Sequence, residues 1–553
     1  MTDALRKVTP TKTGQQAQAR RDQIPNAAGG FVFKITPEQR LRRFLTIGTD
    51  GGTFYIDEQQ LTIENATLVI DYAKNHPVEL VDLVEEISVA GRAPRQNPAI
   101  FALAAVQAFG GHEGHEAIRN KLTSIVRTGE HMTQFVNYSH NMTDWNRSLR
   151  KSIENWYLSQ EANQLAYQVI KYRQRNGWTH KDIFCVGHPN PADKNITFRS
   201  LMHWVRRGDS VDENDHYFIG EASTLPQLVD DFQQLQAATT VDKWVAIIHD
   251  NKSITHEMLP DAALREPRVW EALVENQMPM TALIRQLPRL TNLGVIGPGQ
   301  AFNYQVIGQL TNTELLAKAR VHPMRMLLAA RTYAAGRGMR STWTPVPQIV
   351  DALDKGFYST FGNVRKTGKN ILLALDVSSS MGSLVSSKIP ISCREASAAI
   401  ALVTASVEDN VTIVGFTSGR NVDWGANWRS NATLTPIDIS PRRRLDDNVR
   451  RISNLPFGGT DCALPAIWAT DNNLDFDAIC IYTDNETWAG SKHPYQALNK
   501  YRKHVGHQVY QVVVGMTATD FSIADPTDPH SLDVAGLDAS VPSVITDFLA
   551  GDA

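Results

Sequence analysis

The sequence predicts two structural modules, an array of α-helices followed by an α/β domain built on a parallel sheet. Between about residues 60 and 355 the apolar residues recur with a helical period, as in segment 61–92, where they fall at i, i+3, i+4 and i+7. From residue 370 the pattern changes to short, almost wholly apolar runs that alternate with helical segments. Such runs are typical of strands covered on both faces.

The expected elements follow in order along the chain. Residues 1–25 are polar and carry little to bury, so we expect a flexible polar arm. The helical region, 26–365, shows no strict sequence period and is expected to be an irregular stacked array. Its further helices are expected at 97–109, 114–127, 146–158, 161–175, 224–236, 261–276 and 315–336. The α/β domain, 366–553, is expected to carry strands at 370–375, 411–416, 478–483 and 509–515.

Composition restricts the function classes. The 553 residues include 55 Lys and Arg against 58 Asp and Glu, a formal net charge of −3. A protein that coats nucleic acid indiscriminately carries a large positive excess, so nucleic acid would have to bind at a local basic patch. The four cysteines are widely separated and form no CxxC pair, which argues against a disulfide framework and a zinc site. The sequence has neither a secretory signal nor a membrane-spanning run, so we expect a cytoplasmic protein.

Oxygen-bearing side chains at expected strand ends predict a metal site. Asp376, Ser378 and Ser380 follow the strand 370–375, Thr460 lies in a glycine-turned loop, and Asp484 follows the strand 478–483. Ligands of open α/β sheets gather at the carboxyl ends of the strands, so these loops can converge. Two carboxylates and three hydroxyls suit Mg²⁺ or another divalent cation. The alternative is that Ser and Asp only cap the following helices.

This arrangement resembles the von Willebrand factor A domain and its metal-ion-dependent adhesion site. The resemblance implies that Ser378, Ser380 and Thr460 lie near the ion, with Asp376 and Asp484 contributing directly or through water. It also implies that the ion is presented to an acidic protein ligand, whose identity is unknown. Catalytic motifs fit poorly, since segment 362–370 has the wrong spacing for a P-loop and no GxSxG elbow occurs, so we do not expect an enzyme.

Segment 171–189 concentrates basic and aromatic side chains. Its basic residues are Lys171, Arg173, Arg175, His180, Lys181 and His188. Lys171 and Arg175 are four residues apart, so we expect them to share a helix face. Cations beside Tyr172 and Trp178 offer what single-stranded nucleic acid needs, namely phosphate neutralisation and rings for stacking. The alternative, a solvated helix end before Gly177, is favoured by composition alone.

This segment, together with 51–66, 91–104, 147–157 and 482–490, resembles the Ro ribonucleoprotein autoantigen family. The similarity runs in order from about residue 30 to the end. It implies a TROVE domain, a ring of HEAT-like helical repeats whose outer basic surface binds small noncoding Y RNAs and whose hole admits single-stranded 3′ ends of misfolded RNA. By position in the matching motif, Lys171, Arg175 and His188 would contact RNA. Arg173 and Lys181 are added only from charge and proximity.

The resemblance implies an RNA-binding protein that acts in noncoding RNA quality control and processing. In bacterial members it implies a partnership with an exonuclease such as polynucleotide phosphorylase. We expect a monomer that has no membrane partner. The alternative is a metal-dependent protein-interaction scaffold to which RNA binding is incidental. Residues 1–25 and the insert 418–444 have no counterpart in the family, so nothing is carried over to them.

Overall fold

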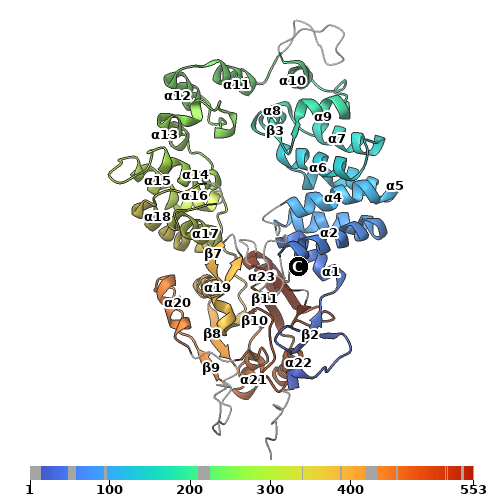
Figure 1. Ribbon diagram of the computed structural model, residues 1–553, viewed down its shortest axis with the longest axis vertical. Coiled ribbons are helices and arrows are strands. Elements are labelled where there is room, and N and C mark those ends of the chain that lie inside the picture. Colours follow the sequence, from blue (N-terminus) through green and yellow to red (C-terminus); the bar gives the residue numbers. More distant parts are fainter. Residues whose placement is uncertain are drawn as a thin grey trace, which may run out of the picture.

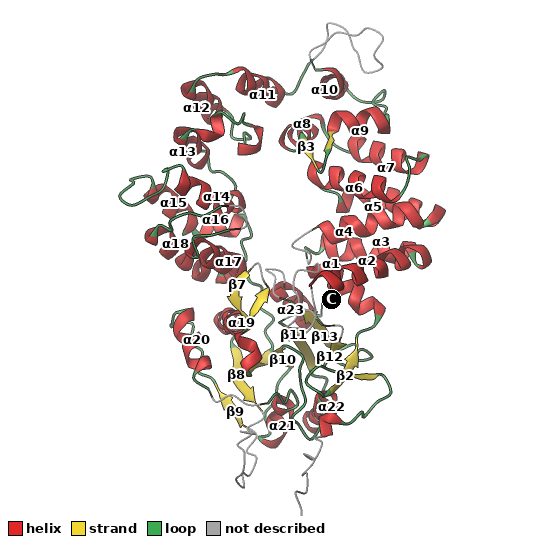
Figure 2. Ribbon diagram, in the orientation of Figure 1, coloured by secondary structure: helices red, strands yellow, loops and turns green. Residues whose placement is uncertain are grey.

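The computed structural model describes most of the chain. The described residues are 14–47, 58–91, 96–208, 224–338, 341–386, 389–417, 433–455, 459–516, 519, 521–536 and 541–551. Figure 1 shows a ring of helices whose two ends meet on an α/β domain. The predicted order of modules is therefore confirmed, and Figure 2 shows helices throughout the ring and strands together with helices in the α/β domain. Among the residues so described, none of the helices combines the length and apolar character needed to cross a membrane.

Helices form the ring, with one short hairpin between its eighth and ninth helix. The first half contains α1 (Pro37–Ile47), α2 (Glu58–Asn75), α3 (Pro77–Val89), α4 (Asn97–Phe109), α5 (Gly111–Ile125), α6 (Gly129–Met142), α7 (Arg147–Leu158), α8 (Ala162–Lys171), α9 (His180–Gly187) and α10 (Ile196–Arg207). The second half contains α11 (Gln227–Ala237), α12 (Val241–Asp250), α13 (Pro267–Glu275), α14 (Met280–Asn292), α15 (Asn303–Leu310), α16 (Thr313–Lys318), α17 (Pro323–Ala334) and α18 (Pro347–Ser359). The hairpin consists of β3 (Gln174–Arg175) and β4 (Trp178–Thr179).

Local sequence sets many of the helix ends. The side chain of Asn146 accepts a hydrogen bond from the backbone N–H of Leu149 at the start of α7, and Asn195 does the same at α10. Prolines lie in the first turn of α3, α4, α13, α17 and α18, where the missing N–H is not needed. These residues explain why the helical period read from the sequence translates into separate helices.

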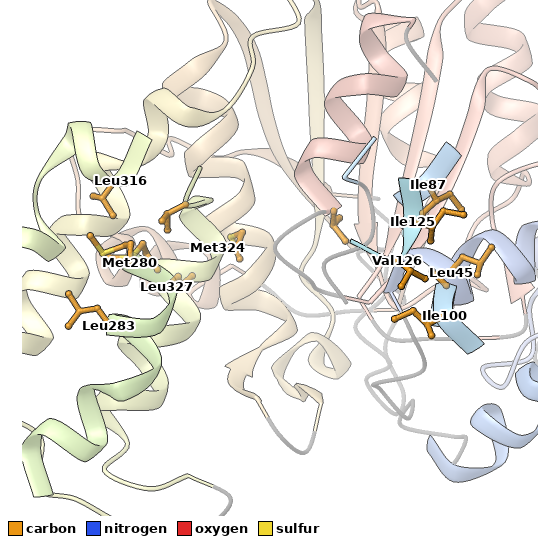
Figure 3. Packing of buried hydrophobic residues seen from close by; sticks show 14 of the residues in the cluster. Leu45, Ile87, Ile100, Ile125, Val126, Met280, Leu283, Leu316, Met324 and Leu327 are labelled. Carbon is orange, nitrogen blue, oxygen red and sulfur yellow. The ribbon is translucent and has the colours of Figure 1, made fainter. Parts of the chain in front are cut away.

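The ring is held together by packing between helices that are close in sequence. Helix α2 packs on α4, α3 on α5, and α4 on α6, so each new helix extends the same stack. Figure 3 shows this apolar core on both sides of the ring. Its labelled members are Leu45, Ile87, Ile100, Ile125 and Val126 in the first half, and Met280, Leu283, Leu316, Met324 and Leu327 in the second. Each such side chain stabilises the fold by about 1.5–3 kcal/mol when fully buried. The packed core therefore holds the helices, and the surface residues on them, in fixed positions.

The α/β domain contains a six-stranded sheet in the order β13-β11-β10-β5-β8-β9. Its strands are β5 (Asn370–Asp376), β8 (Asn410–Thr417), β9 (Thr433–Pro436), β10 (Ala478–Thr483), β11 (Tyr510–Gly515) and β13 (Ser531–Ala535). Its helices are α19 (Cys393–Val407), α20 (Leu445–Ser453), α21 (Leu464–Asp471), α22 (Pro494–Val505) and α23 (Val541–Ala550). The four predicted strands are confirmed as β5, β8, β10 and β11, and they pair in parallel.

The predicted all-parallel sheet needs one correction, because β9 pairs antiparallel with β8 at the sheet edge. This strand lies within the insert 418–444, of which residues 418–432 fall outside the described residues. An antiparallel neighbour needs no crossover helix, and otherwise parallel sheets commonly carry such a strand at an edge. Pro436, which lacks a backbone N–H, ends this strand where fewer ladder bonds are required.

Successive side chains of a strand point to opposite faces of the sheet. In the central strands the apolar residues of both faces are buried, because helices cover the sheet on both sides. Leu373 and Leu375 of β5 belong to the same core as α19 and α23, whereas Leu372 and Ala374 belong to the core of α21 and α22. This two-sided burial explains the continuous apolar runs that the sequence displays.

The predicted flexible arm is wrong for residues 14–25, which pack on the α/β domain, while residues 1–13 lie outside the described part. The strand β1 (Gln23–Pro25) pairs with β2 (Phe31–Lys34), and β2 pairs in turn with β12 (Phe521–Ser522) of the α/β domain. Gln15 and Gln23 are buried, and each is hydrogen-bonded. Polar side chains can be buried once they are hydrogen-bonded, which a count of apolar residues does not detect.

Charged contacts join both ends of the ring to the α/β domain. At the first end, Arg43 of α1 forms an ion pair with Asp533 of β13. At the other end, Arg331 of α17 donates a 2.6 Å hydrogen bond to Glu395 of α19 and forms an ion pair with Asp446 of α20. The ring is therefore closed through the α/β domain, as Figure 1 shows.

Candidate functional site

Two neighbouring parallel strands, β5 and β10, bring the first predicted metal ligands together. Asp376 ends β5 and is buried, and its Oδ1 accepts a 2.8 Å hydrogen bond from the backbone N–H of Ser378. The hydroxyl oxygens of Ser378 and Ser380 lie 3.0 Å apart. Thr483, the last residue of β10, donates a 2.8 Å hydrogen bond to Asp376 Oδ2. The turn after β5 thus gathers one carboxylate and two hydroxyls at one point.

The other two predicted ligands lie on loops that are bonded to each other. The backbone oxygen of Thr460 accepts hydrogen bonds from the N–H groups of Trp488 and Ala489, at 3.0 and 3.1 Å. Both donors belong to the loop that begins with Asp484, directly after β10. Thr460 and Asp484 are both buried. The structure therefore brings the predicted residues to one edge of the sheet, as the parallel-strand argument requires.

The capping alternative accounts for part of the carboxylate contacts but not for the hydroxyls. Asp376 and Asp484 each accept a hydrogen bond from the backbone N–H two residues on, at 2.8 and 3.2 Å. Ser378 stands at the start of a short 3₁₀ turn (Ser379–Gly382), but its side chain makes no capping hydrogen bond there. The helix that follows Thr460, α21, also begins without a side-chain cap. The hydroxyls are thus free of the structural role that would otherwise explain them.

Buried negative charge dominates the electrostatics of this edge. Burial and the negative charge of Asp484 together raise the pKa of Asp376 to about 7. A third acid, Glu486, is also buried, and burial raises its pKa to about 7. Among the described residues, its Oε1 has no hydrogen-bond partner. Arg394 lies nearby, but its guanidinium donates to the backbone oxygen of Ser378. Arg394 offsets part of the negative charge, since it also interacts electrostatically with Asp376. The carboxylates and hydroxyls are a donor set that fits a hard divalent ion.

This donor set contains few carboxylates and depends on hydroxyls. Within the described ranges, no group of three or more His, Cys, Asp or Glu side chains is placed to hold a metal. Sequence reasoning missed Thr483 and Glu486, although both lie in the segment 482–490 that carried the family resemblance. The hydroxyl of Thr483 contacts Asp376 on the neighbouring strand β5, and the carboxylate of Glu486 contacts Ala28, far away in the chain.

The predicted shared helix face of Lys171 and Arg175 is wrong. Helix α8 ends at Lys171, and Arg175 lies on β3. The cause is the pair Asn176 and Gly177, which adopt φ values of 53° and 81° and form the two-residue turn between β3 and β4. Asn-Gly is a strong signal for such a hairpin turn, because both positions need a positive φ. The signal was present in the sequence and outweighs helical spacing.

Tertiary structure nevertheless brings Lys171 and Arg175 to a common neighbour. Lys171 Nζ donates a 3.0 Å hydrogen bond to the hydroxyl of Tyr167 and lies over that ring at 5.1 Å. The pKa of His256 is lowered by burial, and the positive charges of Lys171, Arg289 and Arg175 lower it further. We call Lys171, Arg175 and Arg289 the basic cluster. Arg289 belongs to α14, in the other half of the ring, and sequence reasoning missed it.

The remaining predicted RNA contacts lie around this hairpin. Lys181 and His188 are exposed at opposite ends of α9, and His188 ends the helix in the left-handed conformation, with φ 48°. Arg173 is exposed, and its guanidinium lies 5.7 Å from the ring centre of Phe232 on α11. Trp178 is half-buried against Trp145, edge to face at 5.6 Å. Part of its ring therefore packs within the protein, and its stacking on RNA stays a prediction.

Comparison with known proteins gives matches to both modules. The TROVE domain family matches residues 24–340, and the Ro60 vWA domain family matches residues 370–549. The RNA-binding protein RO60 of Caenorhabditis elegans is 33% identical over 607 residues, covering 97% of this chain and 91% of that protein. The RNA-binding protein RO60 of Deinococcus radiodurans is 33% identical over 559 residues and covers all of both chains. The crystal structure of the Deinococcus radiodurans RO (RSR) protein superposes with a TM-score of 0.72 at 31% identity, covering 94% of this chain and all of that one.

Proposed function

This chain belongs to the family of proteins that join a TROVE domain to a Ro60 vWA domain, and from that premise we propose that it binds RNA on its helical ring. Two of its relatives are named RNA-binding proteins. In this proposal the ring holds the RNA, and the vWA domain closes the ring and offers a metal site to a second partner.

The basic cluster is the observation that carries the proposal. Lys171, Arg175 and Arg289 come from two halves of the ring, and the charges of all three act on His256. The guanidinium of Arg289 lies 5.1 Å from the ring centre of Trp270, which packs 5.6 Å from the ring of His256. The acid Glu257 lies 3.2 Å from His256 and offsets part of this positive charge. Positive side chains that converge from separate elements supply phosphate neutralisation, which dominates the affinity of proteins for nucleic acids. Because the net charge of the whole chain is −3, RNA would be attracted to this locality rather than to the surface at large.

The finer function follows from the family. We propose that the bound RNAs are Y-type noncoding RNAs and the single-stranded 3′ ends of misfolded or structured RNAs. The protein would act in noncoding RNA quality control and processing in the cytoplasm, as a monomer, together with an exonuclease such as polynucleotide phosphorylase. Lys181, His188 and Arg173 would extend the RNA contact from the basic cluster along the hairpin and α9.

We further propose that the vWA domain binds Mg²⁺. Ser378, Ser380 and Thr460 would supply hydroxyl oxygens, while Asp376 and Asp484 would balance the charge directly or through water. A bound Mg²⁺ would supply a Lewis-acidic position for a carboxylate oxygen of an acidic protein partner. The buried thiols beside this site, Cys393 and Cys462, both have a raised pKa, about 12 for Cys393, so neither is a ready nucleophile. This supports a binding role over a catalytic one.

The test of RNA binding compares two duplexes, one with a single-stranded 3′ tail and one blunt, across a salt series. Lys171→Ala/Arg175→Ala is expected to weaken binding of the tailed duplex and to reduce the salt slope by about one and a half units. The matched control is Lys500→Ala/Lys503→Ala, which removes two exposed cations from α22, at the end of the molecule remote from the ring in Figure 1. Equal affinity of all three proteins for both duplexes would refute the proposal and favour a metal-dependent protein-interaction scaffold.

A further inference from the structure

Residues 14–34 lie across the loops of the vWA domain that carry Thr460 and Asp484, and we call them the N-terminal strap. Gln15 is fully buried between these loops. Its side-chain Nε2 donates a 2.7 Å hydrogen bond to Asp461 Oδ1, and its Oε1 accepts a 2.7 Å hydrogen bond from the hydroxyl of Thr487. One side chain thus bridges the residue after Thr460 to the loop after Asp484.

Two further contacts join the strap to the same loop. Asn26 Nδ2 donates a 2.9 Å hydrogen bond to the backbone oxygen of Thr487. The backbone N–H of Ala28 donates a 3.0 Å hydrogen bond to Glu486 Oε2. The loop that begins with Asp484 is therefore held at consecutive residues, 486 and 487, by a segment more than 450 residues away in the chain.

Glycines allow the strap to approach this closely. A Cβ atom at Gly30 would overlap with the backbone oxygen of Thr487, and one at Gly14 would overlap with the backbone oxygen of Ser491. A Cβ atom at Gly490 would overlap with the side chains of Gln15 and Asp461. Glycine is the residue that permits such backbone-to-backbone contact. The fit is therefore built into both partners, the strap and the loop.

We propose that Gln15 is a positioning residue for the metal site, so that the N-terminal strap completes a site whose ligands all lie after residue 370. This inference rests on the proposed Mg²⁺ site. Thr460 and Asp484 come from two separate loops, and an ion binds tightly only when its ligands are held in place beforehand. Groups that hold the ligands typically contribute 10–100-fold to metal affinity.

The rest of the strap is attached independently of Gln15. The backbone oxygen of Ala17 lies 2.9 Å from His493 Nε2, Arg20 forms an ion pair with Asp525, and β2 pairs with β12. Loss of the hydrogen bonds of Gln15 therefore leaves the strap docked and changes the two ligand loops locally. The N-terminal strap also continues through β2 into α1. One uninterrupted stretch of chain therefore contacts the loops of the metal site and then forms the first helix of the ring.

The experiment is a calorimetric titration of the full chain with Mg²⁺ alone. Gln15→Met keeps the side-chain length but removes its hydrogen bonds, and is expected to weaken Mg²⁺ binding about tenfold. The matched control is Gln18→Met, the same substitution at an exposed position of the same strap, and it is expected to keep the wild-type affinity. RNA affinity is measured on all variants and is expected to be unchanged, because the basic cluster lies in the ring.

A second pair of variants tests the contact from the other side. Thr487→Val removes the hydroxyl that donates to Gln15 and also accepts a 3.1 Å hydrogen bond from the backbone N–H of Cys462. It is expected to weaken Mg²⁺ binding, and the double variant with Gln15→Met is expected to lose less affinity than the sum of the two single losses, because both variants break the same contact. Thr487→Ser keeps a hydroxyl and is expected to restore the affinity. If Gln15→Met fails to fold, this pair decides the question alone.

The outcomes separate two kinds of failure. If wild type and Asp376→Ala give the same absence of Mg²⁺ binding, the metal site itself is refuted. If wild type binds Mg²⁺ and Asp376→Ala does not, the site stands. Unchanged affinity in folded Gln15→Met, or in Thr487→Val should Gln15→Met not fold, would then overturn the role of the strap.

Discussion

The hydroxyl of Thr483 donates a 2.8 Å hydrogen bond to the carboxylate of Asp376, across 107 residues of sequence. This bond ties the carboxyl end of β10 to that of β5. The same hydroxyl oxygen accepts a 3.2 Å hydrogen bond from the backbone N–H of Asn485. Thr483 thereby orients Asp376 and also fixes the start of the loop that carries Asp484.

Thr483→Val is expected to destabilise the metal-free protein by about 1–3 kcal/mol, because it leaves a buried carboxylate oxygen without its donor. Urea unfolding in the presence of a chelator measures this change. Thr483→Ser keeps the hydroxyl and serves as the control, so it should lie close to wild type. Equal unfolding free energies for Thr483→Val and wild type would show that this hydrogen bond does not contribute to the stability of the metal-free protein.

Asp376→Ala is expected to abolish Mg²⁺ binding while leaving RNA affinity almost intact, because the predicted ligands and the basic cluster lie in separate modules. Calorimetry with Mg²⁺ and filter binding with a 3′-tailed duplex measure the two properties on the same preparation. Loss of RNA binding in a folded Asp376→Ala protein would contradict the division of labour between ring and vWA domain. A hydrolytic activity that disappears with Asp376→Ala would contradict the non-catalytic role.

Arg289→Ala is expected to weaken RNA binding and to lower the salt slope by about 0.7 units, the share of one phosphate contact on a single strand. Arg289 contributes to the basic cluster from α14, so its loss tests whether both halves of the ring engage the RNA. Arg268→Ala, which removes an arginine from the exposed surface of α13, is the control. The prediction fails if the two variants have the same affinity and the same salt slope.

Three histidines of the ring, His180 buried and His131 and His322 half-buried, predict a dependence of stability on acid. Burial lowers the pKa of His131, His180 and His322 to about 4. At His131 and His322 the positive charge of a nearby arginine lowers the pKa further. In the unfolded chain these groups protonate near their ordinary pKa of about 6.5. The unfolded state thus binds more protons between pH 6.5 and 4, so stability is full above pH 6.5 and falls as pH drops through that window.

His180 allows this dependence to be measured one group at a time. Its Nδ1 lies 2.6 Å from the hydroxyl of buried Tyr157. His180→Gln removes the titrating ring and keeps a polar partner for that hydroxyl. It is expected to reduce the pH slope of the unfolding free energy between pH 4 and 6.5 by up to about 1.4 kcal/mol per pH unit. A slope identical to that of wild type would show that His180 does not titrate with unfolding.

The sequence alone determined those features that depend on near neighbours. The helical period, the apolar strand runs and the placement of Asp376, Ser378 and Asp484 at strand ends all follow from residues close together in the chain. Parallel strands then bring those ends to one edge, because their carboxyl ends share a direction. The Asn176–Gly177 turn is also determined by neighbouring residues. Asn-Gly predicts a hairpin there once turn residues are given more weight than helical spacing.

Only the tertiary structure decided the contacts between distant segments. Gln15 meets Asp461 across 446 residues, and the charge of Arg289 acts on His256 together with that of Lys171, from the other half of the ring. Arg289 lies in the amphipathic helix α14, but helical spacing does not reveal which helix it faces. A polar side chain such as Gln15 gives no sign in the sequence of being buried. Whether it is buried depends on hydrogen-bond partners that come within reach only when the N-terminal strap packs on the vWA domain. Local sequence fixes the elements, whereas their packing fixes which polar groups become a site.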